Sequence, residues 1–422
     1  MERNDAIKQL MQQNIVVAIG CTEPVAVALC VAKVKETLGE EVEDIQLLLS
    51  KNIIKNAMGV GIPGTGMIGL PIAVSIAVVC GKSEKELEVL VEGKDHLEEA
   101  KAWLNSHTID IQAKDVEEKL YIECICKGKT SCAKAIIAGT HTNFVHVEKD
   151  NKVLLHKECE KTQECSGIEN VLDTLSAKEV YDYATLEPIE NISWIWHTVE
   201  LNSACSEQGL KGNYGLRIGK TLFNDRDKSI RKEIIGRTCA ASDARMDGIT
   251  LPIYSNSGSG NQGITCTLPV YYYGQYLEAS KEKITRALVL SHLMSIYIKS
   301  KIGRLSALCG AVNAAMGVAS GLVYLSNGTF QQISFAIKNM INTITGVVCD
   351  GAKPSCALKI SATLNSAFDS CALAMQDIVV DTTDGISEGD IDRSINSMGR
   401  IGRYAMDETD DMILDIMTHK QK

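Results

Sequence analysis

The stretch LSALCGAVNAAMGVASGLVYLS, residues 305–326, contains no charged side chain. Three glycines, three serines and one asparagine interrupt its apolar character. A membrane-spanning helix needs about 20 predominantly apolar residues, but these small and polar residues suit a tightly packed interior helix better. The chain has no second segment of this character. We therefore expect a buried central helix, or a broken pair of helices, and no membrane span.

The sequence on both sides of this stretch also has helical periodicity. Long helical patterns with glycine breaks run from about residue 168 onward, and residues 4–19 and 24–37 read as helices near the start of the chain. Small residues are abundant and aromatic residues make up only 5% of the chain. This composition favours closely packed helices over a core built on large aromatic side chains.

Residues 40–160 have a different pattern. A strand is predicted at 41–50, and five further segments that alternate or are rich in β-branched residues follow between 109 and 157. We therefore predict an α+β fold in which a mainly helical domain is interrupted by a smaller α+β domain with an antiparallel sheet. Residues 1–39 and 161–422 would form the helical catalytic domain, and residues 40–160 the smaller domain that supplies a loop covering the substrate.

Charge and cysteine content limit the function. The net charge of −10 and the absence of a basic stripe argue against nucleic acid and anionic membranes as partners. The N-terminal residues lack the apolar core of a signal peptide, so we expect a cytoplasmic protein with reduced cysteines. None of the fifteen cysteines forms a C-x-x-C pair. A metal site would have to combine single, distant cysteines, and most cysteines, such as Cys30, Cys80 and Cys371, read as core residues.

Two glycine-rich segments are candidate binding loops. Gly64 to Gly69 match G-x-G-x-x-G, but no clean strand precedes them and Pro63 stands where it would end. This favours close backbone approach to another element or to a small anion over dinucleotide binding. The segment SNSGSGNQG, residues 255–263, could be a linker. Its position inside the helical domain and its neutral donors favour a carboxylate-binding loop.

Three cysteines occupy similar corners. Cys21, Cys309 and Cys349 each adjoin a glycine-containing break between helical segments. A thiolate near a helix N-terminus is stabilised by the helix dipole and by free N–H groups. These cysteines could pack in the core, act as nucleophiles, or jointly hold a metal cluster. His141 in GTHTN, at the end of an apolar strand, is the leading acid/base candidate.

With these segments the sequence resembles the L-cysteine desulfidase family, which is related to the iron–sulfur L-serine dehydratases. The resemblance follows the family order along nearly the whole chain, through GCTEP, GVGIPGTGMIGLPIA, GTHTN, ASDARMDG with SNSGSGNQGI, LSALC and CDGA with SCALK. It implies a [4Fe–4S] cluster ligated by Cys21, Cys309 and Cys349, with the fourth iron open to substrate. It also implies conversion of L-cysteine and water to pyruvate, ammonia and sulfide without pyridoxal phosphate. The cysteine tail that closes the open iron in some serine dehydratases is absent from the final residues, IMTHKQK.

The resemblance suggests roles for residues around the cluster. His141 and Lys51 are candidate bases, with Lys353 as a further possibility. The residues expected to line or bind the substrate are Asn52, Thr65, Gly66, Asn143, Asn256, Ser257, Ser259, Asn261 and Gln262. Cys356 could pack or serve as a spare ligand, Asp243 and Arg245 could form a structural ion pair, and Glu23 is expected to act on the helix dipole.

Three alternatives remain open from the sequence. L-serine or L-threonine dehydration could occur at the same site. A protein of this fold could also bind an amino acid without turnover. A metal-free thiol enzyme could use Cys21 with His141. The expected partner in the main hypothesis is L-cysteine alone, and the abundance of small residues is compatible with a homodimer.

Overall fold

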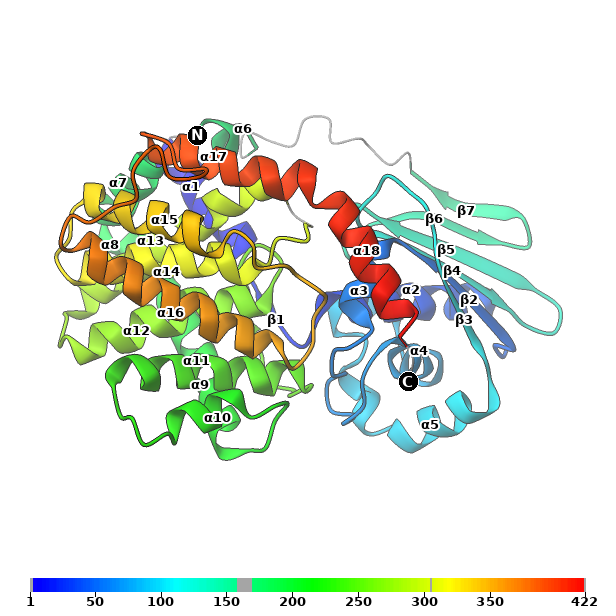
Figure 1. Cartoon of the computed structure of the whole chain (residues 1–422). Coiled ribbons are helices and arrows are strands. Elements are labelled where there is room, and N and C mark those ends of the chain that lie inside the picture. Colours follow the sequence, from blue (N-terminus) through cyan, green and yellow to red (C-terminus); the bar gives the residue numbers. More distant parts are fainter. Residues whose placement is uncertain (1–2, 158–168, 304–305, 421–422) are drawn as a thin grey trace.

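The computed structural model describes residues 3–157, 169–303 and 306–420. Figure 1 shows a large helical domain beside a smaller domain built on one sheet. This confirms the predicted α+β class with mainly helical content. The chain enters the helical domain first, crosses to the sheet domain, and returns for the remaining helices.

The helical domain is formed by thirteen helices of the described residues. They are α1 (Arg3–Asn14), α6 (Glu169–Thr174), α7 (Ala177–Leu186), α8 (Ile189–Ile192), α9 (Trp196–Lys211), α10 (Ile218–Phe223), α11 (Ile230–Met246), α12 (Gly260–Tyr276), α13 (Lys281–Ile302), α14 (Gly310–Leu325), α15 (Phe330–Ile344), α16 (Cys356–Ala374) and α17 (Ile391–Arg400). A short 3-10 turn, Ser193–Ile195, joins α8 to α9.

Helix α14 is the central helix predicted from the apolar stretch. It contacts α12, α13, α15 and α16, and nearly all of its residues are buried. A Cβ on Gly317 would lie 2.3 Å from the carbonyl oxygen of Ser291 on α13. The glycines of this stretch therefore allow close helix packing. Within the described ranges, no helix is both long and apolar enough to cross a membrane.

The smaller domain contains a six-stranded sheet of order β3-β2-β4-β5-β6-β7. Its strands are β2 (Asp44–Leu49), β3 (Ile109–Ala113), β4 (Tyr121–Lys127), β5 (Cys132–Ala138), β6 (Phe144–Lys149) and β7 (Lys152–His156). The predicted all-antiparallel sheet needs one correction, because β2 and β3 run parallel. The chain between them makes a long helical crossover, which parallel neighbours require.

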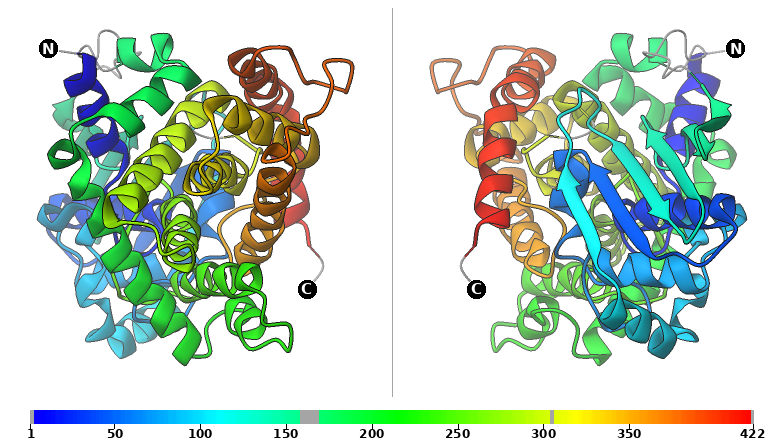
Figure 2. Two further views of the ribbon diagram at one scale, coloured as in Figure 1. Left: turned by 90° about the vertical axis from the view of Figure 1, so that its left-hand side faces the viewer. Right: turned by 90° about the vertical axis from the view of Figure 1, so that its right-hand side faces the viewer.

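That crossover contains α3 (Lys51–Ala57), α4 (Leu70–Val79), α5 (Leu97–Ser106) and the 3-10 turns Ser83–Glu88 and Val91–Lys94. Together with α2 (Thr22–Leu38) these helices lie on one side of the sheet, and Figure 2 (right) shows the strands in front of them. Alternation along β4 explains this arrangement: Ile122, Cys124 and Cys126 face the buried core.

The two hydrophobic cores divide the chain earlier than residue 39, where the sequence placed the boundary. Ala6 to Ile15 of the N-terminal region belong to the core of the helical domain. Val25 to Leu38, on α2, belong to the core beneath the sheet. The largely apolar sequence of α2 resembles that of the helices in the helical domain, which is why the sequence predicts α2 in that domain. In the structure α2 packs on β4 and β5.

With helix α18 (Asp407–Thr418) the chain crosses to the sheet domain a second time. The helix follows α17 through a π-helical turn, Ile401–Ala405, and crosses from the helical domain to α3 (Figure 1). Asp410 pairs with Lys55 and Asp411 with Lys51, both on α3. Leu414 joins the core of the sheet domain. The C-terminal helix therefore fastens the sheet domain to the helical domain.

The packing of α9 on α11 gives a test of this fold. A Cβ on Gly209 of α9 would lie 2.0 Å from the carbonyl oxygen of Ala240 on α11. Gly209→Ala should therefore force the helices apart and lower the free energy of unfolding by roughly 2–4 kcal/mol, although alanine favours helix. Gly346→Ala is the control, because a Cβ there meets nothing within 4 Å. Equal denaturation midpoints for the two variants would contradict the packing.

Candidate active site

Cys309 and Cys349 come together at the start of α14. Cys309 is the N-cap of α14, and Cys349 lies in the segment before α16. Leu308 and Val348 form an antiparallel bridge, Cys309 N donates to the oxygen of Val347 at 2.9 Å, and Cys349 N donates to the oxygen of Ala307 at 2.5 Å. These backbone bonds hold the two thiols side by side.

Cys356 lies close to this pair, and an apolar cluster links Cys356 to Cys21. Cys356 opens α16, and its thiol contacts the carbonyl oxygen of Gly351 at 3.6 Å. The charge of Cys349 helps to raise the pKa of Cys356, and the charge of Cys356 helps to raise the pKa of Cys309. Cys21 belongs to a small apolar cluster against which Cys356 packs. The sequence left Cys356 between packing and ligation, and the structure places it beside Cys309 and Cys349 and against the cluster that contains Cys21.

The thiol pair lies among cationic side chains. Hydrogen bonding from the Cys309 thiol lowers the pKa of Cys349, with further lowering by Lys55 and Lys359, although burial opposes it. The pKa of Cys309 is raised, first by this hydrogen bond and then by burial. Burial lowers the pKa of Lys299 to about 8, and both thiols oppose that shift. The geometry therefore favours a thiolate at Cys349.

The donor set fits an iron–sulfur cluster in its chemistry. Cys309 and Cys349 supply two adjacent sulfurs, Cys356 supplies a third beside them, and three lysines offset negative charge. Cys21 lies in the apolar cluster against which Cys356 packs. In the described part of the chain, no three histidine, cysteine or acidic side chains already converge at metal-binding distance. The thiols are therefore neighbours without being arranged around a single ion.

The Cys21 corner is held by polar contacts from both domains. Cys21 is the N-cap of α2, and its thiol donates to Glu23 Oε2 at 2.8 Å. Asn56 of α3 donates to Glu23 Oε1 at 3.1 Å, and Arg245 donates to the oxygen of Gly20 at 2.9 Å. Burial and then Glu23 raise the pKa of Cys21. The expected dipole role of Glu23 is therefore incomplete, because its carboxylate also contacts the thiol.

A short two-stranded sheet brings this corner to the predicted carboxylate loop. Strand β1 (Val17–Ala18) pairs with β8 (Ile253–Tyr254), and the loop 255–259 leads directly into α12. Ser259 caps α12 by accepting from the backbone N–H of Gln262. The N–H groups of Gly260 and Asn261, in the first turn of α12, have no partner within the helix, so they are available to an anion.

Within this loop, two of the predicted substrate residues are used internally. Asn256 is fully buried and donates to His292 Nδ1 at 3.1 Å, while Ser257 Oγ donates to Asn256 Oδ1 at 2.8 Å. His292 Nε2 in turn contacts Thr267 Oγ1 at 3.0 Å. Burial lowers the pKa of His292 to about 3, so the imidazole is neutral. The sequence missed His292 because it lies in an apolar helix far from any motif.

Gln262 and Asn261 point in different directions. Asn313 donates to Gln262 Oε1 at 2.7 Å, and a Cβ on Gly310, which follows Cys309, would lie 2.6 Å from Gln262 Nε2. Gln262 is therefore packed beside the thiol pair. Asn261 is half-buried, and its Oδ1 accepts from Arg245 at 3.3 Å.

The glycine loop 59–69 makes the contact between the domains. A Cβ on Gly61 would lie 2.4 Å from the carbonyl carbon of Asp247, and Gly64 N donates to the oxygen of Gly248. Thr65 Oγ1 donates to the oxygen of Ile62 at 2.8 Å and accepts from Met67 N, so its hydroxyl stabilises the loop. Gly66 has φ of +64° and nothing within 4 Å of its Cβ position, which leaves it open.

The candidate residues at the start of α3 and in the loop 139–143 lie at the same end of the strands β2, β4 and β5. Gly139 N donates to the oxygen of Leu120, and Ser50 N to that of Tyr121, so the loop 139–143 and the start of α3 are neighbours. His141 and Asn52 are half-buried there. Asn143 Nδ2 donates to the oxygen of Ala138 at 3.1 Å and closes its own loop.

The two candidate lysines of α3 differ in their environment. Lys51 is partly exposed, and its ammonium pairs with Asp411 at 2.8 Å, which also raises the pKa of Lys51. Lys55 is buried and pairs with Asp410, and of the two lysines of α3 it is the one that lowers the pKa of Cys349. Lys353 is held by Asp350 at 2.6 Å. Lys55 is therefore the lysine of α3 that faces the thiols, and the sequence missed it.

Asp243 and Arg245 do not form the expected ion pair in the described structure. Asp243 Oδ2 accepts from the backbone N–H of Gly219 at 2.8 Å, and its Oδ1 is buried without a hydrogen-bond partner among the described residues. Arg245 donates to Asn261 and Gly20, and its buried Nε likewise lacks a partner there. Two positions apart on α11, the side chains point to different neighbours.

Other proteins are similar to this chain over nearly its whole length. A sequence model described as serine dehydratase alpha chain matches residues 151–415. The UPF0597 protein of Phocaeicola vulgatus is 51% identical and the alignment covers 99% of this chain and 98% of that protein. The UPF0597 proteins of Bacteroides thetaiotaomicron and Actinobacillus pleuropneumoniae are 49% and 42% identical, with 98% of each protein covered. The names of these relatives state no substrate.

The two lysine–aspartate pairs on α3 should differ in strength. Asp410→Ala would leave the buried Lys55 ammonium unpaired, so it should lower the free energy of unfolding by ~3–5 kcal/mol. Asp411→Ala removes the more exposed pair with Lys51 and should cost less than ~1 kcal/mol. Chemical denaturation of both variants tests this difference. A smaller loss in Asp410→Ala than in Asp411→Ala would show that the buried pair does not hold α18 in place.

Asp243 should make stability depend on pH. Burial raises its pKa to about 6, whereas an unfolded aspartate titrates near about 4. Between these values the folded state binds the extra proton, so stability falls as pH rises, by at most about 3 kcal/mol. Asp243→Asn lacks this ionisation. Its thermal midpoint should rise relative to that of wild type from pH 4.5 to 7, whereas that of Asp95→Asn, at an exposed position of the sheet domain, should follow wild type. A constant difference for Asp243→Asn across this range would contradict the assignment.

Proposed function

Because the chain belongs to the serine dehydratase alpha chain family, we propose that it is a lyase acting on a small α-amino acid, and that its substrate is L-cysteine. The products would be pyruvate, ammonia and hydrogen sulfide. The motifs GCTEP, GTHTN and SNSGSGNQG support cysteine as the substrate, through their resemblance to L-cysteine desulfidases.

The observation that carries this proposal is the meeting of Cys309, Cys349 and Cys356 beside lysines, with Cys21 in the apolar cluster against which Cys356 packs. We propose that Cys21, Cys309 and Cys349 ligate a [4Fe–4S] cluster, with Cys356 as the alternative third ligand because it also lies beside the pair. When bound, such a cluster with one open iron supplies a Lewis acid for the departing sulfur. Lys55, Lys299 and Lys359 would offset the negative charge of the thiolates.

The start of α12 would bind the substrate carboxylate. Its first N–H groups lack helical partners, and Ser257, Ser259 and Asn261 are accessible beside them. Arg245 places positive charge against Gly260, where a Cβ would lie 2.1 Å from its Nε. Asn256 and Gln262 would support the loop and the thiol pair through their internal hydrogen bonds.

The loop 139–143 would close the site and remove a proton. We assign His141 to accept the proton from the α-carbon as hydrogen sulfide leaves the β-carbon. The resulting aminoacrylate tautomerises and is hydrolysed to pyruvate and ammonia. Asn52, Thr65, Gly66 and Asn143 would line the cavity and exclude water. Lys51 is a weaker base candidate, since Asp411 holds its ammonium.

L-serine is the second candidate substrate, because the matching family is described as a dehydratase. The same proton removal would then expel water from the β-carbon. Anaerobically purified protein should release pyruvate and sulfide in equal amounts from L-cysteine, at a kcat/KM at least tenfold above that for pyruvate from L-serine. Pyruvate from serine with no sulfide from cysteine would reassign the substrate. Sulfide release by iron-free protein would reject the cluster.

Single alanine variants test the ligand assignment. Cys309→Ala and Cys349→Ala should lose most of the bound iron and the visible absorption of the purified protein. Comparison of Cys21→Ala with Cys356→Ala identifies the third ligand as the one whose loss also removes iron. Cys80→Ala is the control, since Cys80 bonds to the oxygen of Ile76 within α4. Equal iron in all five variants would reject cysteine ligation at this site.

A further inference from the structure

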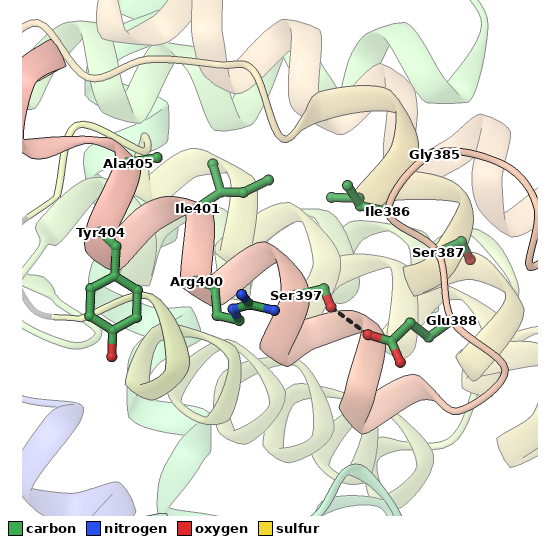
Figure 3. Close-up of a pocket in the computed structure, with 9 residues that line it drawn as sticks. All are labelled: Gly385, Ile386, Ser387, Glu388, Ser397, Arg400, Ile401, Tyr404 and Ala405. Carbon is green, nitrogen blue, oxygen red and sulfur yellow. Dashed lines mark hydrogen bonds between the residues drawn. The ribbon is translucent and has the colours of Figure 1, made fainter.

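A pocket on the described surface lies away from the cysteines, between the loop before α17 and the π-helical turn after it. Its volume is about 490 Å³, which is in the range of small-molecule sites. Figure 3 shows its lining residues, which are Gly385, Ile386, Ser387, Glu388, Ser397, Arg400, Ile401, Tyr404 and Ala405. None of these residues takes part in the proposed function.

Two opposite charges line this pocket without forming an ion pair. Glu388 Oε1 accepts from Ser397 Oγ at 2.5 Å, and the structure records no salt bridge between Glu388 and Arg400. Within the described residues, no hydrogen-bond partner is recorded for the Arg400 guanidinium. Figure 3 shows Arg400, Ser397 and Glu388 in a row along one side of the pocket. A ligand that carries both charges could therefore bind to both groups.

A buried hydroxyl in the same wall also lacks a partner. Ser387 is only 4% exposed, and its Oγ makes no hydrogen bond within the described structure. Such a group costs about 1–3 kcal/mol when it stays unpaired. Because the Oγ itself is screened from solvent, a polar ligand atom would reach it and remove that cost only once the Ser387 side chain rotates toward the pocket. This observation is independent of the two charges.

The remaining wall is apolar. The side chains of Ile386 and Ile401 point toward one another across the pocket in Figure 3, and Tyr404, at its end, is 71% exposed. Ile401 and Tyr404 belong to the π-helical turn, a distortion that is frequent at functional sites. The pocket therefore offers a cation, an anion and an apolar surface within one small volume.

We propose that this pocket binds a free α-amino acid with an apolar side chain. Its carboxylate would bind Arg400, its ammonium group Glu388, and its side chain Ile386 and Ile401. An α-amino acid carries both charges on one carbon, so a single small ligand of this class supplies a partner for each of the two groups. A simple carboxylic acid or amine would leave one of the two charges unpaired.

The pocket wall is joined to the segment that precedes Cys309. Ser306 Oγ donates to the oxygen of Gly402, in the π-helical turn, at 2.5 Å, and accepts from Leu308 N at 3.1 Å. The same turn leads into α18, which holds Lys55 through Asp410. An amino acid bound here would therefore contact the segment that positions both Cys309 and Lys55.

Calorimetric titration of the anaerobically purified full-length protein with L-leucine tests the site. Leucine has no leaving group on its β-carbon, so it is bound without turnover. We expect one saturable site with a Kd on the order of 1 mM, as suits a small ligand in an open pocket. Arg400→Gln and Glu388→Gln should each weaken binding at least tenfold. Arg393→Gln, an exposed arginine on α17 outside the pocket, should leave it unchanged.

Ligand analogues and one catalytic variant complete the test. Leucinamide and 4-methylpentanoate, which lack the carboxylate and the amine respectively, should each bind at least tenfold more weakly than leucine. Cys309→Ala should bind leucine as wild type does, even if the proposed lyase activity is absent. No saturable binding, or equal binding in all pocket variants, would overturn the proposal. Binding that is lost in Cys309→Ala but kept in Arg400→Gln would place leucine at the cysteines and overturn it as well.

Discussion

Backbone-to-backbone contact between the two domains is the constraint on which the candidate site depends. A Cβ on Gly61 would collide with the backbone of Asp247, and a Cβ on Gly351 would lie 2.1 Å from the oxygen of Lys55. Gly351 also has φ of +91°, which favours glycine. These contacts bring α3 of the sheet domain against the turn that carries Cys349. Cys349 and Lys55 meet only because this junction is so close.

Electrostatics at the junction follow from burial and from charge pairing. Cys309 and Cys349 lie near Lys299 and Lys359, and Cys349 also lies near Lys55. The buried Lys299 would be costly to keep charged without an anionic neighbour. The Cys349 thiolate provides that neighbour, and Lys55 and Lys359 in turn help to lower the pKa of Cys349. Helix α18 supplies Asp410 to Lys55 from the far end of the chain. The charge balance of the site therefore depends on three segments that are distant in sequence.

Much of the fold was predictable from local patterns. The uncharged, glycine-containing stretch at 305–326 predicted a buried helix, and α14 confirms it. Alternating segments predicted the strands of the smaller domain, but not the parallel pairing of β2 with β3, since pairing partners leave no local pattern. The apolar sequence of α2 predicted that the helix is buried, but not which element it packs against. It packs beneath the sheet, although its composition resembles that of the helical domain.

For the candidate site, the sequence by itself determined the chemical groups and their local settings: cysteines at helix starts, a capped loop before α12, and a glycine-rich loop. The tertiary structure alone decided which groups meet and which are already used. It placed Cys356 beside Cys349, selected Lys55 over Lys51 as the lysine facing the thiols, and assigned Asn256 and Thr65 to internal hydrogen bonds. The reason is physical, because these contacts join residues far apart in the chain and arise only when the two domains pack together.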